Sequence, residues 1–216
     1  MPSNRILTTI ALVTSIVPAL AAAEPKTFVV RPDGGSRIQF LSDAPLETIN
    51  GVSTRISGTL TVDPASVSGA RGTLTAQTNG LRTGIDLRDE HLRSDTWLDS
   101  HRFPNSTFEI TSVEGGGALT ANQQTQVRVR GRFTLHGVTK DVVATARVRW
   151  MPVTDEMRQQ ASAAPTAPAR LSSDVLRINA TFDVNLTDYN VSVPAIVRLK
   201  VSNTIRINVN LRAVAQ

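Results

Sequence analysis

Apolar and polar side chains alternate strictly between Val127 and Trp150, and the phase of the alternation reverses once, at His136-Gly137. A period of two residues is typical of a β-strand, and one apolar face opposite one polar face is typical of a half-buried antiparallel sheet. Gly137 readily adopts the positive φ that a two-residue turn needs, and His tolerates it better than most residues. The pattern therefore predicts a β-hairpin with an apolar inner face.

A two-residue turn at His136-Gly137 also fixes which residues face each other across the predicted hairpin. On the polar face it places Arg132 opposite Asp141, a favourable cross-strand pair of charges. On the apolar face it predicts three pairs: Gly131 with Val142, Val129 with Ala144, and Val127 with Ala146.

The same alternation recurs along the rest of the chain and predicts further strands. They are expected over residues 26–31, 36–42, 54–62, 71–79, 106–113, 175–186 and 197–211. The first two flank an Asp33-Gly34-Gly35 turn. A straight strand over 197–211 would reach roughly 50 Å, too long for one barrel strand. We therefore expect a bend or bulge near Asn203, the polar residue in its inward-facing series.

One segment, 86–100, has a convincing helical pattern. Asp86 is the expected N-cap, and Asp89 suits the first turn of a helix. A second short helix is expected to start at Ser94-Asp95. Loops are predicted at 114–125 and at 154–173, and the second of these, rich in Ala, Pro and Ser, is interpreted as a flexible insertion.

At least eight strands with one apolar face need a way to hide their edges, and closing into a barrel is the simplest. We therefore predict an all-β fold, an antiparallel barrel of about eight strands with a short helical lid. The inward-facing residues are mostly small and aliphatic, and the chain has nine aromatic residues (two Trp, one Tyr and six Phe). Such side chains would leave a narrow, elongated, apolar space unfilled. A membrane barrel would instead need aromatic girdles that nine residues cannot supply.

Residues 1–23 have the anatomy of a secretory signal peptide: Arg5, an apolar run over 6–17, Pro18 and Ala21-Ala22-Ala23. Twelve apolar residues are fewer than the ~20 needed to cross a bilayer. We therefore expect cleavage after Ala23, a single domain over 24–216, and a periplasmic or secreted location. The chain has no Cys, so its core is expected to be stable without disulfides.

Beyond the predicted signal peptide, 22 Lys and Arg residues (23 less Arg5) exceed 18 Asp and Glu residues by four. Many basic residues occupy outward strand positions, as on any solvated barrel. The alternative is weak, transient attraction to an anionic membrane surface. Nucleic acid is not expected, because no aromatic platform lies beside the basic positions and export removes this partner. A homodimer is compatible with the sequence.

The candidates for acid–base or metal chemistry are three histidines, His91, His101 and His136. Their spacing matches no metal site, and the chain offers no thiolate. No Gly-x-Ser-x-Gly elbow or Gly-rich phosphate loop occurs. We therefore expect no metal, no other cofactor and no enzymatic activity. His91 is interpreted as a packing or capping residue, with polarisation of a ligand head group as the alternative.

A run of charged residues from Arg82 to Arg93 falls near the predicted barrel mouth. In one interpretation it forms ion pairs on the helix surface that hold the lid to the rim, worth about 0–1 kcal/mol each. In the other, Arg88 or Arg93 contacts a phosphate or a quinone oxygen.

Several short motifs occur together in the first two thirds of the chain. They are Leu81-Arg82-Thr83-Gly84, the run from Arg88 to Ser94, Trp97-Leu98-Asp99, Phe103-Pro104, Thr107-Phe108, and the run from Gly131 to Lys140. In order and spacing, residues 27–150 resemble the YceI-like family of exported, lipocalin-like, polyisoprenoid-binding barrels. Beyond Trp150 the likeness thins. Where the family usually has Arg-x-Asp-Phe-Gly, this chain has Leu186-Thr187-Asp188-Tyr189-Asn190.

The resemblance implies a tunnel that holds an isoprenoid chain. We expect a protein that carries or sequesters a polyisoprenoid lipid, an isoprenoid quinone or a prenyl phosphate. The alternatives are an envelope enzyme acting on an isoprenoid-like substrate and a stress-related interaction module with a filled barrel. The expected tunnel wall comprises Phe40, Leu60, Leu74, Phe108, Phe133, Val142, Ala144, Phe182, Leu186, Val197 and Leu199. The expected mouth or head-group residues are Arg88, His91, Leu92, Arg93, Trp97 and Tyr189.

Overall fold

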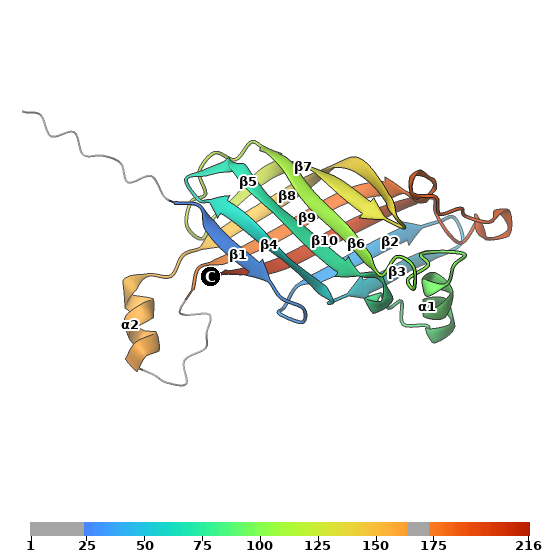
Figure 1. Cartoon of the computed structure of the whole chain (residues 1–216), viewed down its shortest axis with the longest axis horizontal. Coiled ribbons are helices and arrows are strands. Elements are labelled where there is room, and N and C mark those ends of the chain that lie inside the picture. The colour runs from blue at the N-terminus through green and yellow to red at the C-terminus, as the bar shows by residue number, and fades with distance from the viewer. Residues whose placement is uncertain (1–23, 164–172) are drawn as a thin grey trace, which may run out of the picture.

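The computed structural model describes residues 24–163 and 173–216 (Figure 1). The predicted signal peptide over 1–23 lies outside the described residues. The described part contains ten strands: β1 (Lys26–Val30), β2 (Arg37–Asp43), β3 (Thr48–Ser53), β4 (Ile56–Asp63), β5 (Ser66–Gln77), β6 (Asn105–Glu114), β7 (Gln124–Leu135), β8 (Val138–Met151), β9 (Val175–Asn185) and β10 (Thr204–Ala215). Its two α-helices are α1 (Asp86–Arg93) and α2 (Asp155–Ala163).

Eight strands close into an antiparallel barrel, which confirms the predicted all-β fold class. The barrel runs in the order β1, β4, β5, β6, β7, β8, β9 and β10, and β10 closes it by pairing with β1 (Figure 1). Only the end of β10 reaches β1, because residues Ile205–Asn210 pair with β2 instead. β2 in turn pairs with β3, so a two-stranded ribbon extends the wall at one end.

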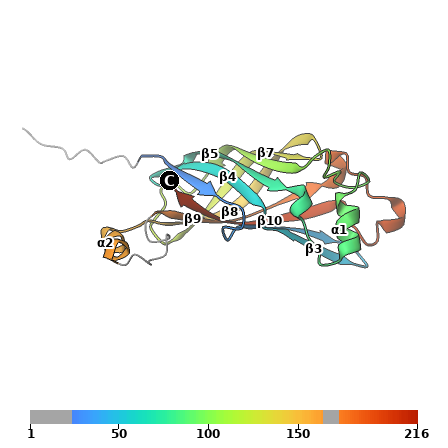
Figure 2. The ribbon, with the colours of Figure 1, turned by 60° about the horizontal axis from the view of Figure 1, so that its bottom comes forward.

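The two ends of the barrel differ in what surrounds them. Helix α1 and the β2–β3 ribbon lie together at one end, and α2 lies at the other, near the C-terminus (Figures 1 and 2). The main chain of β3 reaches toward α1 through a bridge between Val52 and Arg82. No helix among residues 24–163 and 173–216 has the length and apolar character needed to cross a bilayer.

The hairpin of β7 and β8 has the register that its sequence predicts. Gly131 pairs with Val142, Val129 with Ala144, and Val127 with Ala146. His136 and Gly137 form the turn with φ values of 49° and 75°, as a two-residue turn of this twist requires. Arg132 does stand opposite Asp141, but its Nη2 donates to Oε2 of Glu109 on β6 at 2.6 Å.

Several predicted strands differ from those observed. β1 and β2 flank the Asp33–Gly35 turn but do not pair with each other, because β1 joins β4 and β2 joins β10. β3 was missed. The predicted strand over 197–211 was wrong in its first part: Ala195–Val197 forms a 3₁₀ turn, and β10 starts at Thr204. Asn203 marks this change, since its side chain hydrogen-bonds to the backbone and hydroxyl of Thr187.

The predicted helix over 86–100 is shorter than expected. It ends at Arg93, and turns follow in place of a second helix, held by hydrogen bonds such as that from the Asp99 amide to the Ser94 carbonyl at 2.8 Å. Asp86 is the first helical residue, and Ile85 occupies the N-cap without a side-chain hydrogen bond. α2 lies within the predicted flexible insertion, part of which, 164–172, falls outside the described residues.

Candidate functional site

The barrel encloses a cavity of about 790 Å³, a size within the usual range for ligand pockets of roughly 300–1,000 Å³. Its walls are mainly aliphatic and aromatic side chains from β2 and from β4 to β10. Four charged or titratable residues line it among the described residues: Glu47, Arg88, His91 and Lys200. All four come from segments at the end that carries α1 and the β2–β3 ribbon. The cavity is therefore an apolar bore with its charges confined to one end, which we call the mouth.

Nine of the eleven predicted wall residues line this cavity. They are Phe40, Leu60, Leu74, Phe108, Phe133, Ala144, Phe182, Leu186 and Val197. Val142 is on the inner face of the hairpin and packs against the core, but it does not line the cavity. Leu199 was placed wrongly, because its segment is a loop and its side chain is 58% exposed.

An aromatic cluster forms part of the wall. The ring of Phe182 packs against Phe108 and Phe133, with ring centroids 5.6 Å and 5.3 Å apart. Gly131 leaves room for this packing, because a Cβ at that position would lie 2.5 Å from Cε1 of Phe108. The apolar alternation of the hairpin predicts an inward Gly131, but its close contact with an aromatic ring is a tertiary feature.

Four of the six predicted mouth residues line the cavity: Arg88, His91, Leu92 and Trp97. Arg93 does not, and its Nη1 is buried without a hydrogen-bond partner among the described residues. Tyr189 is 1% exposed and packs edge-on against Phe133 outside the cavity lining. Burial, with a smaller effect of Asp188, raises the pKa of Tyr189 to about 12.

A hydrogen-bonded network fixes α1 at the mouth. Oδ1 of Asp89 accepts from the amide and the hydroxyl of Thr83 at 2.7 and 2.6 Å. Nε of Arg88 donates to the same Thr83 hydroxyl at 3.0 Å, and its Nη1 pairs with Glu47 at 2.7 Å. The network thus joins the helix to the preceding loop and to the β2–β3 turn. Thr83 and Glu47 were missed as mouth residues, although Thr83 lies in the Leu81–Gly84 motif.

The charge of Asp89 is stabilised although the residue is only 3% exposed. Burial alone would raise the pKa of its carboxyl group, but the two hydrogen bonds from Thr83 act in the opposite direction. Together with the positive charges of Arg82 and Arg93 they hold the pKa below its usual value. This carboxylate therefore remains ionised at neutral pH and keeps its acceptor role.

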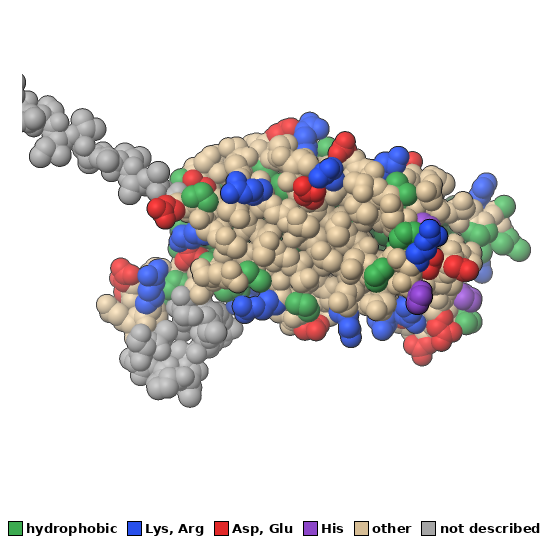
Figure 3. Space-filling model, in the orientation of Figure 1, with side chains coloured by type: hydrophobic (Ala, Val, Ile, Leu, Met, Phe, Trp, Pro, Cys, Tyr) green, Lys and Arg blue, Asp and Glu red, His purple; other side chains and the backbone are tan. Residues whose placement is uncertain are grey.

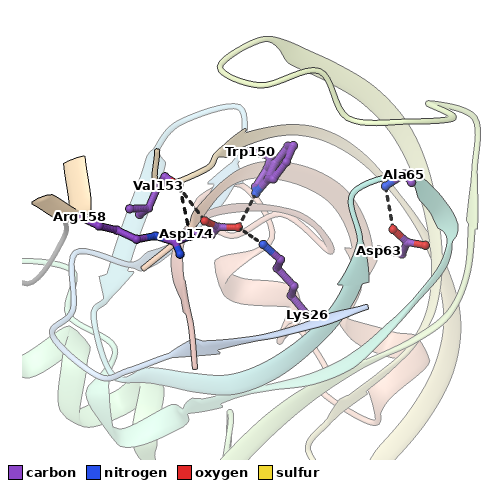
Figure 4. Close-up of polar contacts among 7 residues, drawn as sticks. All are labelled: Lys26, Asp63, Ala65, Trp150, Val153, Arg158 and Asp174. Atoms are coloured by element: carbon purple, nitrogen blue, oxygen red, sulfur yellow. Dashed lines mark hydrogen bonds and ion pairs between the residues drawn. The ribbon is translucent and has the colours of Figure 1, made fainter. Parts of the chain in front are cut away.

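The opposite end of the barrel carries a second buried carboxylate, Asp174 (Figure 4). It accepts hydrogen bonds from Nζ of Lys26 at 2.6 Å, the Val153 amide at 2.8 Å and Nε1 of Trp150 at 3.2 Å. Burial would raise its pKa, but these contacts, led by that of Lys26, lower it instead. Asp174 thereby ties β1, the end of β8 and the chain entering β9 together at this end.

The three histidines are not grouped at the cavity. His91 lines it, whereas Nδ1 of His136 lies 3.1 Å from the carbonyl oxygen of Tyr189 and its ring packs edge-on against Phe103. Within residues 24–163 and 173–216, no three His, Cys, Asp or Glu residues are grouped as a metal site would need.

Comparison with known proteins gives a consistent pattern. A family model described as a YceI-like domain matches residues 29–213. Protein YceI of Salmonella newport is 35% identical over 112 residues, which cover 52% of this chain and 53% of that protein. Protein YceI of Salmonella arizonae is 36% identical over 91 residues, covering 42% of this chain and 44% of that protein. The matched segment thus spans about half the length of these relatives.

Solved structures share the barrel fold at low sequence identity. BcnA of Burkholderia cenocepacia superposes with a TM-score of 0.63 at 16% identity, over 85% of this chain and 98% of that chain. A polyisoprenoid binding domain from Saccharophagus degradans, implicated in plant cell wall breakdown, gives a TM-score of 0.64 at 16% identity, over 89% of this chain and 100% of that chain.

Proposed function

Because the chain belongs to the YceI-like family, we propose that its barrel binds a polyisoprenoid lipid and carries or sequesters it in the bacterial envelope. The observation that supports this most directly is the cavity of about 790 Å³, which is apolar along its length and charged only at the mouth. That division matches a ligand with a long hydrocarbon tail and a small polar head group. The solved polyisoprenoid binding domain with the same fold adds support.

The tail would occupy the bore. Burying one five-carbon isoprene unit from water is worth about 4 kcal/mol, at ~0.8 kcal/mol per methylene-sized group. A lipid that starts in a bilayer has already gained this energy, so the net driving force for transfer into the barrel is close to zero. Selectivity must then come from the shape of the bore and from the polar contacts at its mouth. This balance suits a carrier, because the ligand can be released as well as taken up.

The head group would lie between the charged residues of the mouth. Arg88 and Lys200 offer positive charge and His91 offers a ring nitrogen; Arg88 and His91 come from α1 and Lys200 from the β9–β10 loop. Such groups suit a phosphate or a quinone oxygen. Glu47 offsets part of the charge of Arg88 through their 2.7 Å ion pair. Lys200, which forms no ion pair with a described residue, is therefore the stronger candidate for contact with an anionic head group.

An interaction module with a filled barrel does not account for this volume. An enzyme in the barrel would depend on His91, the one histidine that lines the cavity. We favour a binding protein over an enzyme because most of the cavity wall is apolar, and because Glu47, the one carboxylate that lines the cavity among the described residues, is paired with Arg88. We also propose export through the segment 1–23, a single domain over 24–216 and a periplasmic or secreted location.

The proposal is tested by extracting the protein, purified from its native host, with organic solvent and analysing the extract by mass spectrometry. We expect a polyisoprenoid, and its repeated absence, together with failure to load from detergent, would contradict the proposal. In Ala180→Trp, a larger side chain would enter the bore from β9. Displacing two or more methylene groups should weaken retention about tenfold or more.

The control is Thr145→Trp, which adds the same side chain to the outer face of β8, where Thr145 is exposed. It should retain lipid as the parent protein does. Circular dichroism would establish that both variants fold, and Ala180→Phe gives a smaller obstruction if the Trp variant does not. Equal retention by a folded Ala180 variant and by Thr145→Trp would place the ligand outside the bore.

A further inference from the structure

Exposed apolar side chains gather around the mouth of the cavity. Among the described residues, seven large apolar side chains are exposed, and five of them belong to segments that surround this opening. These five are Leu46, Ile85, Leu87, Ile196 and Leu199. Figure 3 shows such side chains along the loops at the end that carries α1. A soluble surface rarely concentrates apolar residues in this way unless it contacts an apolar partner.

Three of these residues lie together on one lip of the mouth. Ile196 is 92% exposed and Leu199 is 58% exposed, both on the loop between β9 and β10. Leu46, on the β2–β3 turn, is fixed beside them because its amide donates to the Leu199 carbonyl at 2.8 Å. Val197 and Lys200, from the same loop, line the cavity. The exposed apolar surface is therefore continuous with the bore.

The β9–β10 loop brings only positive charge to this lip, and Glu47 of the β2–β3 turn is paired with Arg88. Between Tyr189 and Asn203 the sequence contains Arg198 and Lys200 but no Asp or Glu. Neither base forms an ion pair with a described residue, although Nε of Arg198 donates to the Val193 carbonyl at 3.4 Å. We call Leu46, Ile196, Arg198, Leu199 and Lys200 the mouth patch.

The basic residues on the barrel wall are partly paired. Three pair with acidic residues on neighbouring strands, Arg130 with Glu114, Arg132 with Glu109, and Arg206 with Asp183, while others, such as Arg128 and Arg147, form no ion pair with a described residue. The charges of these three are offset locally, and the wall lacks the clustered exposed apolar side chains of the mouth, with Val143 as its one exposed large apolar residue among the described parts of β7 to β10. The outer strands therefore fit a solvated surface better than a membrane contact.

We propose that the mouth patch docks the protein on an anionic lipid bilayer. Leu46, Ile196 and Leu199 enter the interfacial region, while Arg198 and Lys200 contact lipid phosphates. The mouth then opens toward the acyl chains, so an isoprenoid tail can pass between bilayer and bore without crossing water. This proposal extends the proposed function by identifying the membrane as the partner from which the ligand enters and the surface that meets it.

Docking can be measured without any isoprenoid. The full chain is sedimented with vesicles of phosphatidylcholine alone and of phosphatidylcholine mixed with phosphatidylglycerol. We expect stronger binding to the anionic vesicles and a loss of binding at high salt. The double variant Ile196→Asp, Leu199→Asp should bind about tenfold less tightly or weaker still, because two apolar side chains no longer enter the interface. Arg198→Gln should weaken anionic binding about fivefold.

Val143→Asp is the matched control, since Val143 is an exposed apolar residue on the barrel wall. It should bind vesicles as the parent does. Equal binding by Val143→Asp and the double variant, or no binding by the parent, would overturn the proposal. The proposal would also be overturned if the parent formed a dimer, the double variant did not, and neither protein bound vesicles. That result would assign the patch to contact with a second copy of the chain.

Loading from detergent micelles that contain a polyprenol separates docking from ligand binding. Neither Ile196 nor Leu199 lines the cavity, so the double variant should load from micelles as Val143→Asp does but acquire the same polyprenol from vesicles at least about tenfold more slowly. A parent that binds vesicles but never retains polyprenol would contradict the proposed function alone. A parent protein that retains polyprenol but does not bind anionic vesicles would contradict the docking proposal alone.

Discussion

Asp89 shows how a single buried charge can set the geometry of the mouth. Its carboxylate accepts two hydrogen bonds from Thr83, and Thr83 in turn accepts from Arg88, which reaches across to Glu47. Without the carboxylate, the Thr83 amide would have no partner and Arg82 and Arg93 would lose a nearby negative charge. The orientation of Arg88 toward the cavity thus depends on a residue that does not line it.

We expect Asp89→Ala to lower the free energy of unfolding by about 1–3 kcal/mol, as for a buried hydrogen-bond donor left unpaired. Hydrogen exchange should also become faster across the loop and helix between Arg82 and Arg93. Chemical denaturation and exchange mass spectrometry would measure the two effects. Glu90→Ala is the control, because Glu90 is exposed on the same helix. If both variants behaved alike, the network would have no role in holding the helix.

At the scale of the element, the hairpin β7–β8 depends on its two-residue turn. Gly137 has a φ of 75°, which L-residues with a Cβ adopt only with strain. A Cβ there would also lie 2.5 Å from Cε1 of Phe103. Gly115 has a similar φ of 80° but open space around it. Alanine substitutions at the two glycines can therefore distinguish the cost of backbone strain from the cost of a steric clash.

We expect Gly115→Ala to destabilise the protein by about 1 kcal/mol and Gly137→Ala by about 2 kcal/mol or more, since only the second also displaces an aromatic ring. Thermal unfolding followed by circular dichroism would compare the two. Equal losses of stability would mean that Phe103 moves aside freely and that strain alone matters at the turn.

Elements with a strong apolar alternation were predictable, and elements that depend on distant contacts were not. The register of β7 with β8 follows from Gly137 and the period of two. β3 was missed because the residues that it buries, Ile49, Gly51 and Ser53, include only one large apolar side chain. Its place in the ribbon depends on pairing with β2. The chain before Thr204 alternates like a strand, yet Pro194 and the contacts of Asn203 hold it as a loop.

The site was predictable to the extent that it coincides with the inner face of the strands. Phe108, Phe133 and Phe182 follow from their strand positions, and all three line the cavity. The mouth depends on how separate loops meet. Leu199 was therefore expected inside and lies outside, and Tyr189 was expected at the opening and lies buried. Thr83 and Glu47 could not be assigned, because only the folded chain brings them to Arg88.

At the scale of the whole molecule, the two buried carboxylates lie at opposite ends of the barrel, Asp89 beside the mouth and Asp174 at the end that carries α2 (Figure 1). Asp89 positions the helix beside the opening, whereas Asp174 joins Lys26, Trp150 and Val153 at the opposite end (Figure 4). The pKa values of both carboxylates are lowered, so each contributes stability that depends on its charge.

The sign of the resulting pH dependence follows from these shifts. An aspartate whose pKa is lower in the folded than in the unfolded state stabilises the fold at pH values above its unfolded-state pKa, ~3.9. This contribution is lost as the pH falls through the pKa of the folded state. We therefore expect stability to be nearly constant from neutral pH down to about pH 4 and to fall below it. Denaturant titrations at a series of pH values would measure this dependence.

Asp174→Asn tests how much of this loss of stability belongs to the end of the barrel that carries α2. Asp174 is 5% exposed and holds an ion pair and two neutral donors, so the variant should be less stable by about 2–3 kcal/mol at neutral pH. Below about pH 4 the parent loses the same charge, and the difference between the two proteins should shrink. Asp188→Asn, at an exposed position near the mouth, should follow the parent at every pH. A difference between Asp174→Asn and the parent that stays constant with pH would show that packing around Asp174, rather than its charge, holds this end of the barrel together.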